Sequence, residues 1–478
     1  MTHNRTPAPA TLYEIDHRTQ QMCVNMHRNG FWIDEVRRKQ LVAHFEKSVE
    51  QRRTKILSLL DKPNMSPGSD AQVRDLLYEE WGLGIPKHLE PRDFYTDTGL
   101  PSTGDKVLRG HLAHGELDEN RWQALYELRL YRREKNKVLG GLARFAPRAT
   151  SEKGWVDADG RVRATWNAHV TAVGRLSCSQ PNLQNQGSRR GLSITKEIFT
   201  AGPGHILIGA DLDQAHLRII ANYWGVKRLL SCFLEGFDPH CTLAFDIFGD
   251  RFKNAAGWGE KGFNLKGKPK DKTSPASSMR EITKTFRYAS AYWAEVPTVW
   301  GVLTSTENAD GTLPYIKMTP AQVNVFNRVL HTSEPDWRQS WAAMVRLYDA
   351  QGYLEEPVMG RRSGVLSDGK KQEVVNYPIL AAEASLMRIA EERVMRAFPH
   401  QFAGPGTGMI HQCHDSICVE VPLPKGFDPF WKPKKGEPLP PELERQRLKL
   451  EECMTLKIPG WPVVISAEAD VGRTLADV

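Results

Sequence analysis

The stretch from His205 to Tyr223, HILIGADLDQAHLRIIANY, constrains the fold more than any other part of the chain. It begins with an apolar run, Ile206 to Ala210, of the length and composition of a buried strand, and the run stops at Asp211. From Gln214 onward the apolar residues recur three and four apart, which is the spacing of an amphipathic helix. The sequence therefore predicts a buried strand that ends on a carboxylate and is followed at once by a helix.

A second apolar segment with an acid lies far downstream, where the run from Met409 to Val419 passes through His414 and Asp415. If both acids end neighbouring strands, two carboxylates 4–5 Å apart would repel by about 4 kcal/mol at an effective dielectric near 20. A divalent cation removes that repulsion, and Mg²⁺ prefers oxygen ligands while it keeps positions open for water and phosphates. Each acid taken alone is more typical of a turn or a helix cap than of a metal ligand, so the metal site depends on their convergence.

The segment SMREITKTFRYASAYW, from Ser278 to Trp293, predicts a helix, and Ser278 with Glu281 has the spacing of a capping box. Two cations and two aromatic residues recur every four positions and so form one stripe: Arg280, Lys284, Tyr288 and Tyr292. A triphosphate could lie along the cations while base and sugar meet the tyrosines. The alternative is an ordinary surface helix, which would not require aromatic residues in register with the cations.

Length and composition restrict the class of protein. A chain of 478 residues should divide into two or three domains. Its 64 basic and 57 acidic residues give a net charge of +7 and a pI near 8.9, which mildly favours a polyanionic partner. There is no apolar run long enough to span a membrane and no N-terminal signal core, so membrane insertion and export are not expected. The seven cysteines are scattered without CxxC spacing, which indicates reduced thiols in a cytoplasmic protein and no zinc site.

The composition of several other segments predicts their local structure or a binding surface. The polar stretch TAVGRLSCSQPNLQNQ, Thr171 to Gln186, has no apolar periodicity, and its amides and hydroxyls suit sugar, phosphate and minor-groove oxygens. A basic helix face between Arg129 and Arg144 is either a solvated surface or a track for phosphates. Arg251 to Ser278 is expected to be a mobile basic insertion, Pro422 to Pro441 an irregular connection, and Val463 to Val471 an alternating strand.

Three of these segments resemble the motifs of one known family. TAVGRLSCSQPNLQNQ resembles the TxTGRLSSxxPNLQN signature of family A DNA polymerases, the bacterial polymerase I and phage replicative polymerase group. GADLDQAHLR follows at the interval of that family's first acidic motif, and the helix stripe resembles its RxxxKxxxF/YxxxY helix. The resemblance covers residues from about 15 to 478 and implies an α+β right-hand fold, in which the palm is an antiparallel β-sheet and the thumb and fingers are helical. The implied segments are a lead-in packing on the palm (1–40), the thumb (41–150), the palm (151–230 and 370–478) and the fingers (231–369), with the basic insertion at about 251–278.

The resemblance also implies roles for single residues in template-directed addition of dNTPs to a primer 3′-hydroxyl. Asp211, Asp415 and the carbonyl of Leu212 would bind two Mg²⁺ ions, for which Mn²⁺ could substitute, and Lys284 would donate a proton to pyrophosphate. The nucleotide-binding residues would be Arg280, Lys284, Tyr288, Tyr292, His240, His216 and Gln214. The primer-template contacts would be Arg175, Asn182, Gln184, Asn185, Gln412, His414 and Asn376, and Arg189 or Arg190 would be a further phosphate contact. For His240 a satisfied structural histidine is the alternative.

The chain departs from the family pattern at three positions. His216 stands where the family usually has the Glu that excludes a 2′-hydroxyl, Ser416 replaces a Glu after the His-Asp pair, and Leu380 replaces a Gln on the long helix. These departures leave open a relation to single-subunit RNA polymerases or a sugar-permissive enzyme. A non-catalytic scaffold that holds primer-template is a second alternative, although both metal-binding aspartates persist.

Further expectations concern partners and location. The chain shows no Asp-x-Glu proofreading strand, so we expect no 3′–5′ exonuclease in cis and no 5′ nuclease. A separate exonuclease or a processivity factor is a possible partner. The protein is expected to be a monomer in the cytoplasm, that of the host cell if it is phage-encoded.

Overall fold

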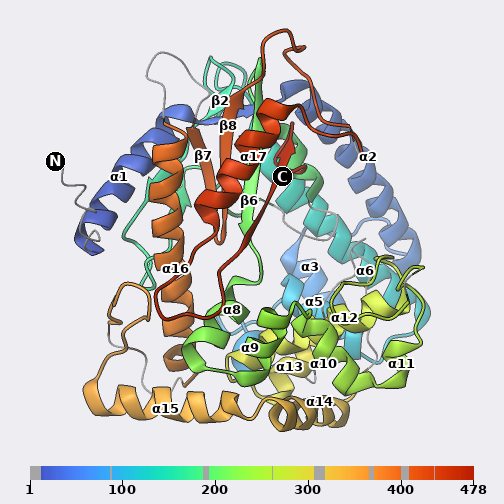
Figure 1. The fold of residues 1–478 in the computed structure, drawn as a ribbon. Coiled ribbons are helices and arrows are strands. Elements are labelled where there is room, and N and C mark those ends of the chain that lie inside the picture. The colour runs from blue at the N-terminus through green and yellow to red at the C-terminus, as the bar shows by residue number, and fades with distance from the viewer. Residues whose placement is uncertain are drawn as a thin grey trace, which may run out of the picture.

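The computed structural model describes residues 12–86, 89–186, 193–260, 262–305, 318–364, 366, 371–399, 408–434 and 436–478. The predicted phosphate contacts Arg189 and Arg190 lie outside the described residues. Figure 1 shows the central sheet in the upper part of the molecule, a helical arm along one side and a layer of helices below.

The central sheet has the strand order β7-β8-β6-β9, and every neighbouring pair is antiparallel. Its strands are β6 (His205–Leu212), β7 (Gly408–Cys413), β8 (Ser416–Pro422) and β9 (Ala467–Gly472). The predicted apolar run of β6 is buried between β8 and β9. The helices that pack around this sheet and one another are α1 (Leu12–Asn29), α8 (Ala215–Trp224), α16 (Lys371–Ala397) and α17 (Pro441–Met454).

Two smaller sheets tie the N-terminal segment to the centre. β1 (Phe31–Ile33) pairs with β2 (Arg161–Val162) and with β5 (Phe199–Thr200), and β3 (Thr165–Asn167) pairs with β4 (Ser177–Ser179). A 3₁₀ helix, η3 (Ser193–Ile198), precedes β5. Gly30 separates α1 from β1 at φ +60°, and a Cβ there would come within 2.8 Å of the Val162 carbonyl oxygen, so glycine is required. The polar stretch from Thr171 to Gln186 follows β3 and is thereby fixed beside the central sheet.

The helical arm has a hydrophobic core of its own, which includes Ile56, Leu77 and Leu125. Its elements are α2 (Glu35–Leu60), α3 (Asp70–Arg74), η1 (Asp75–Glu80), α4 (Pro91–Phe94), α5 (Asp105–His114), α6 (Glu119–Arg132), η2 (Arg133–Leu139) and α7 (Gly140–Arg144). Asp34 caps α2 by accepting from the Arg37 backbone N–H.

The basic face predicted on the last helix of this arm is partly internal. Arg129 is 3% exposed and its Nε donates to Asp105 Oδ1 over 2.7 Å. Arg132 binds Asp70 and the carbonyl oxygens of Pro67 and Ser69. These two arginines therefore hold the arm together and do not form a free phosphate track.

The lower layer consists of α9 (Lys227–Glu235), α10 (Pro239–Phe248), α11 (Asp250–Lys253), α12 (Pro275–Ala291), α13 (Val296–Ser305), α14 (Pro320–Ser333) and α15 (Asp336–Gln351). Leu243, Phe286 and Leu330 form its core. The side chain of Arg287 is fully buried on α12 and pairs with Glu334 over 2.7 Å. This pair anchors α12 to the residue that follows α14 within the lower layer.

Three local predictions were wrong in detail. Helix α12, which was predicted to start with a capping box at Ser278, begins at Pro275. Ser274 caps it by accepting from the Ser277 backbone N–H. The basic insertion is not a mobile loop where it is described, because Phe252 and Trp258 are buried in a small cluster with α10 and α12. The closing strand enters the sheet only at Ala467, although burial alternates from Val463 as predicted.

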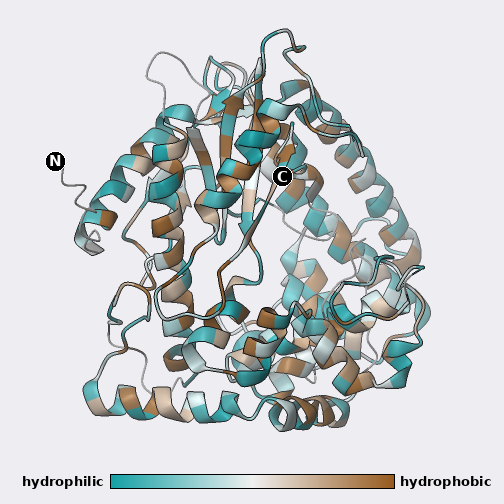
Figure 2. Cartoon of the chain, in the orientation of Figure 1, coloured by the Kyte–Doolittle hydropathy of each residue, from teal (hydrophilic) through white to brown (hydrophobic). Residues whose placement is uncertain are grey.

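Other predictions of this kind are confirmed. The connection after Pro422 is irregular over its described part, and all seven cysteines are free thiols. Figure 2 shows the outer helices banded in teal and brown, as expected of helices with one buried face. Among the described helices none is long and apolar enough to cross a membrane.

Candidate functional site

The two aspartates at the strand ends lie side by side. β6 and β8 pair so that Asp211 is opposite Ser416, and Asp415 occupies the two-residue turn between β7 and β8. The Leu212 backbone N–H donates to the Asp415 carbonyl oxygen over 3.0 Å, which fixes the turn against the end of β6. His414 holds the left-handed conformation that such a turn needs at its first position, at φ +54°. The convergence that the two sequence runs predicted is therefore present in the fold.

The electrostatics of the pair favour a bound cation. Burial and the neighbouring Asp415 carboxylate raise the pKa of Asp211 to about 7. Burial and the charge of Glu383 likewise raise the pKa of Asp415. The described residues contain no cluster of three or more His, Cys, Asp or Glu side chains arranged as a metal site. The pair thus offers two carboxylates and leaves other coordination positions to water or a ligand, which fits Mg²⁺.

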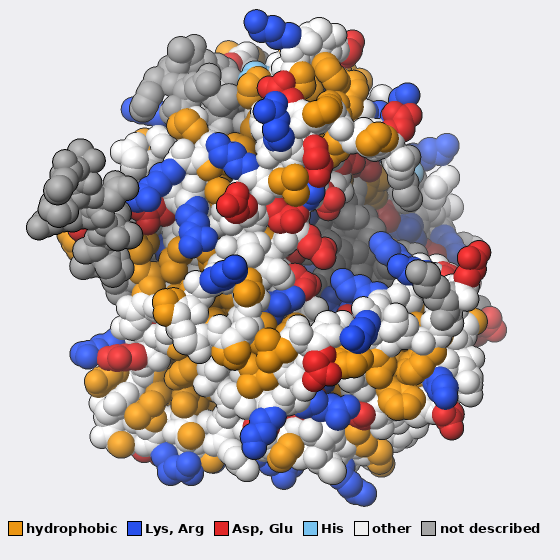
Figure 3. Space-filling model, in the orientation of Figure 1, with side chains coloured by type: hydrophobic (Ala, Val, Ile, Leu, Met, Phe, Trp, Pro, Cys, Tyr) orange, Lys and Arg blue, Asp and Glu red, His pale blue; other side chains and the backbone are white. Residues whose placement is uncertain are grey.

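A cleft of about 840 Å³ opens above the acid pair. In Figure 3 the molecule is hollowed between its upper and lower parts, with acidic side chains on one rim and Lys and Arg on the other. The predicted site residues that line the cleft are Arg175, Asp211, Leu212, Gln214, His216, His240, Arg280, Lys284, Tyr288, His414 and Asp415. Nucleotide and metal residues predicted from separate motifs are thus brought into one cavity.

The predicted stripe on α12 faces this cleft, but its two cations differ. Arg280 is 7% exposed, and its Nε and Nη2 donate to the Asp238 carboxylate over 3.2 and 2.7 Å. Burial would raise the pKa of Asp238, yet the hydrogen bond and charge of Arg280 hold it below its usual value. Lys284 forms no hydrogen bond or ion pair with any described residue. Of the two cations, Lys284 alone offers an uncompensated charge to the cleft.

His240 is buried to 1% exposure, and neither ring nitrogen has a hydrogen-bond partner among the residues that the structure describes. Its ring lies 5.6 Å from that of Tyr288. Burial and the nearby charge of Arg287 hold its pKa well below the usual value. The alternative of a satisfied structural histidine is therefore wrong in this fold, and a neutral imidazole faces the cleft with hydrogen-bonding capacity unused.

The tyrosine end of the stripe joins a network on the cleft floor. Tyr292 does not line the cleft, but its hydroxyl lies 2.5 Å from His216 Nδ1. The other ring nitrogen, Nε2, lies 2.8 Å from Glu383 Oε2, and Arg175 Nη2 bonds the same oxygen. Burial would raise the pKa of Glu383, yet the His216 hydrogen bond and the Arg175 charge hold it below its usual value.

The remaining predicted primer-template residues lie outside the cleft lining. Gln184 Nε2 donates to the carbonyl oxygen and Oε1 of Gln412, and Gln412 Nε2 donates to the His414 carbonyl oxygen over 2.6 Å. Asn182 Oδ1 accepts from the backbone N–H groups of Gln184 and Asn185, which leaves its amide nitrogen outward on an exposed loop. Asn376 keeps a buried Oδ1 without a partner. The polar loop is thus braced against the turn that carries His414.

Three main residues at the cleft were not singled out in the sequence: Glu383 and Lys268 line it, and Asp238, outside the lining, binds Arg280. A signal existed for two of them. Glu383 is a lone acid in the apolar run LAAEASL, and Asp238 precedes Pro239 in the pattern of a helix cap. Lys268 belongs to the basic insertion, where nothing in the spacing marks one lysine among several.

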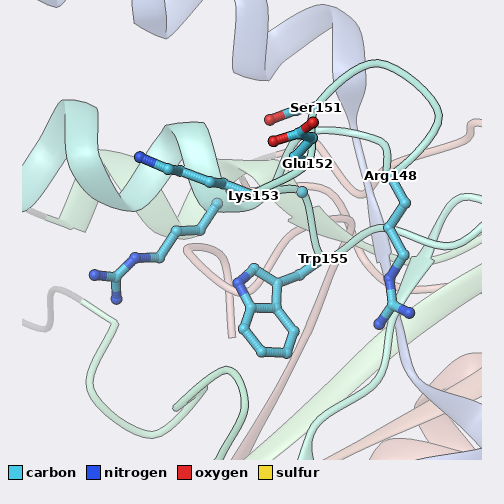
Figure 4. Close-up of a pocket in the computed structure, with 7 residues that line it drawn as sticks. Arg148, Ser151, Glu152, Lys153 and Trp155 are labelled. Atoms are coloured by element: carbon cyan, nitrogen blue, oxygen red, sulfur yellow. The ribbon is translucent and has the colours of Figure 1, made fainter.

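A second hollow, of about 520 Å³, lies on the segment between α7 and β2. It is lined by Arg144, Arg148, Ser151, Glu152, Lys153, Gly154 and Trp155. Figure 4 shows the side chains of Arg148 and Trp155 extending from the same loop, with Lys153 above the indole. Three cations beside an aromatic ring are suited to a phosphate backbone.

Comparisons with known proteins agree with this geometry. A family model described as DNA polymerase family A matches residues 36–257. The chain is 25% identical to DNA polymerase I of Mycobacterium tuberculosis over 435 residues, which are 87% of this chain and 41% of that protein. It is 25% identical to the thermostable DNA polymerase I of Thermus thermophilus over 476 residues, which are 96% of this chain and 47% of that protein. The chain thus spans less than half the length of these relatives.

Among solved structures, the POL domain of Pol1 from M. smegmatis, in complex with DNA primer-template and dNTP, has a similar fold. The TM-score is 0.71 at 21% identity, and the match covers 97% of this chain and 70% of that chain. This likeness confirms the expected fold class, which is α+β with an antiparallel central sheet flanked by two helical parts.

Proposed function

Because this chain carries a polymerase domain of DNA polymerase family A, we propose that it adds dNTPs to a primer 3′-hydroxyl under the direction of a template strand. One observation carries the proposal, which is that Asp211 and Asp415 meet at the floor of a cleft whose opposite wall is the Lys284 and Tyr288 face of α12. An acid pair opposite a cation and an aromatic ring matches the ends of a metal-bound nucleoside triphosphate.

In this proposal Asp211, Asp415 and the Leu212 carbonyl hold two Mg²⁺ ions, with Mn²⁺ as a substitute. The bound ions would lower the pKa of the primer 3′-hydroxyl and neutralise charge on the triphosphate. The 3′-oxygen forms a bond to the α-phosphorus as the bond from that phosphorus to the β-phosphate bridging oxygen breaks. The hydroxyl proton leaves to water, and Lys284 Nζ donates a proton to the departing pyrophosphate.

The nucleotide would lie along α12. Lys284 and the unpartnered imidazole of His240 meet the phosphates, and Tyr288 packs on the base. Arg280 reaches the phosphates only where they compete with Asp238 for its guanidinium, so Asp238 sets how much of that charge is available. Gln214, in a left-handed conformation at φ +52° at the start of α8, would contact the sugar or the β-phosphate.

Primer-template DNA would follow the polar loop and the second hollow. Asn182 and Asn185 are exposed on the loop, while Gln184 and Gln412 brace it beside His414 at the primer terminus. Arg144, Arg148 and Lys153 would add phosphate contacts from the second hollow, in place of Arg129 and Arg132, which are bonded within the arm. Arg175 would act on the cleft floor, and Asn376 on the template side of α16.

We assign the parts of the fold on the same basis. The segment 1–40 is a lead-in on the palm, 41–150 is the thumb, 151–230 and 370–478 form the palm, and 231–369 is the fingers. Closure of the fingers on a matched nucleotide would bring Lys284 toward the acid pair and act as a specificity step. The expectations of a monomer, of no exonuclease activity in cis and of a separate exonuclease or processivity factor stay predictions.

A sugar-permissive or RNA-polymerizing enzyme is the second candidate, and His216 at the expected position of a gating Glu is the observation that favours it. A primer-template scaffold without catalysis is the third. Extension of a labelled primer by the purified chain with Mg²⁺ and each nucleotide sugar separates them. We expect dNTP-dependent extension by the wild-type chain and none by Asp415→Asn. A strong preference for rNTPs would replace the proposal with the second candidate. If neither the wild-type chain nor Asp415→Asn extends the primer, the non-catalytic scaffold would be the remaining candidate.

A further inference from the structure

The cleft floor contains a carboxylate that the polymerase reaction as described does not use. Glu383 is 1% exposed on α16, and one of its oxygens bonds both Arg175 and His216. His216 in turn reaches the Tyr292 hydroxyl through its other ring nitrogen. Four side chains from four separate segments are therefore linked through one buried carboxylate.

The position of this network is that of the incoming sugar, if the proposed function holds. The α-phosphate must sit at Asp211 and Asp415, and the rest of the triphosphate extends toward Lys284. The sugar is bonded directly to the α-phosphate, so it occupies the neighbouring space on the side away from Lys284. That space is bounded by His216, on the first turn of α8, and the Tyr292 ring supports this imidazole from outside the cleft lining, 5.9 Å away.

Glu383 determines how His216 can present itself there. An imidazole alone can rotate and can carry its proton on either nitrogen. A carboxylate at Nε2 stabilises the tautomer with its proton on Nε2, so that Nδ1 accepts from the Tyr292 hydroxyl. With both ring nitrogens engaged and the phenol O–H donated to Nδ1, the wall beside the sugar has a fixed shape and no free donor for an additional hydroxyl.

We propose that Glu383 is a positioning residue for sugar selection, which holds His216 and through it Tyr292 as a wall that rejects a 2′-hydroxyl. The chain would thus retain a gating carboxylate, but it would come from α16 and act through a histidine. This proposal rests on the proposed function, and it predicts preference for dNTPs despite the absence of Glu at position 216.

The test is the ratio of kcat/KM for a dNTP and the matching rNTP, measured by single-nucleotide primer extension. Glu383→Ala should lower the dNTP over rNTP ratio at least about 10-fold, equivalent to about 1.4 kcal/mol, mainly by improving rNTP use. Glu383→Gln, which keeps the shape but not the charge, should lower it less. His216→Glu combined with Glu383→Ala should restore selectivity, because it returns a carboxylate to the Tyr292 side of the cleft.

Glu391→Gln is the matched control, since Glu391 is a buried carboxylate of the same helix that pairs with Arg388 away from the cleft. It should leave the ratio unchanged. Thermal unfolding of each variant identifies any that fail to fold. If Glu383→Ala fails to fold, Glu383→Gln still tests the inference. The inference would be overturned if the Glu383 variants lost kcat/KM equally for the dNTP and the rNTP, or if the wild-type chain preferred rNTPs. Absence of any extension by the wild-type chain would instead overturn the proposed function, and the inference with it.

Discussion

Replacing Asp211 with Asn should stabilise the protein at alkaline pH in the absence of metal. The pKa of Asp211 is raised from 3.8 to about 7 by burial and by Asp415. A raised carboxylate pKa means that the folded state binds a proton more tightly than the unfolded state. Stability therefore falls as pH rises from about 4 to about 7, and the full penalty is present above pH 7. Asn removes the charge that causes it.

The magnitude follows from the shift. About three pKa units at about 1.4 kcal/mol each give a ceiling of about 4 kcal/mol. Asp211 is exposed to the cleft, where solvent screens its charge, so we expect about 1 kcal/mol at pH 8. For a chain of this size that corresponds to a rise of about 1–2 °C in Tm.

The assay is thermal unfolding of wild type and Asp211→Asn in EDTA at pH 4.5 and pH 8, repeated at pH 8 with Mg²⁺. The variant should gain stability at pH 8 and little at pH 4.5. Mg²⁺ should stabilise the wild type, because a ligand of the folded state raises Tm, but should stabilise the variant far less. Asp470→Asn is the control, since Asp470 is an exposed acid of β9 outside the cleft lining.

Two results would refute the reasoning. One is a variant that is no more stable than wild type at pH 8 in EDTA. The other is an equal Mg²⁺ effect on both proteins, which would place the cation elsewhere. Neither readout requires catalysis, so the acid pair is tested independently of the polymerase assay.

Three further predictions concern the cations. Lys284→Met should lower kcat about 100-fold with a smaller effect on DNA binding, measured by single-turnover extension, and an unchanged kcat would exclude Lys284 as a proton donor. Arg144→Gln should reduce the slope of log Kd for duplex DNA against log salt by about 0.9 if one phosphate contact is lost, whereas Arg92→Gln on exposed α4 should not. Asp238→Asn should destabilise the nucleotide-free protein by up to about 3 kcal/mol because Arg280 stays buried without its main partner. Added dNTP should raise the Tm of that variant more than that of the wild type, and equal shifts would mean that Arg280 does not reach the phosphates.

Local patterns in the sequence predicted the elements that carry the acids. The change of apolar period at Gln214 marks the end of β6 and the start of α8, because buried residues recur every two positions in a strand and every three or four in a helix. The break at Asn29-Gly30 separates α1 from β1 for the same kind of local reason. The four-residue repeat from Arg280 correctly predicted one helical face, although Tyr292 lies at its edge and reaches the cleft only through His216.

What the sequence could not predict depends on how distant elements are rotated against each other. Whether Glu383 faces solvent, core or cleft depends on the rotation of α16 against α8, which no local period fixes. The partner of Arg280 depends on the packing of α10 against α12. The insertion that starts at Arg251 was predicted to be mobile because its buried residues, Phe252 and Trp258 among them, have no periodic spacing and cluster only in three dimensions.

The balance of charge in the cleft gives these observations a common physical sense. Arg280 is neutralised by Asp238, and Glu383 is neutralised by Arg175 and hydrogen-bonded to His216, so these groups need no ligand to be stable in the fold. The acid pair and Lys284 lack such compensation among the described residues. Asp211 and Asp415 are repelling carboxylates with raised pKa values, and Lys284 has no anionic partner. Each is destabilising on its own, and each is relieved by a ligand of opposite sign. A cation paired with a polyphosphate relieves both at once, and the aromatic face of Tyr288 beside Lys284 leaves a nucleoside as the group that fits the remaining space.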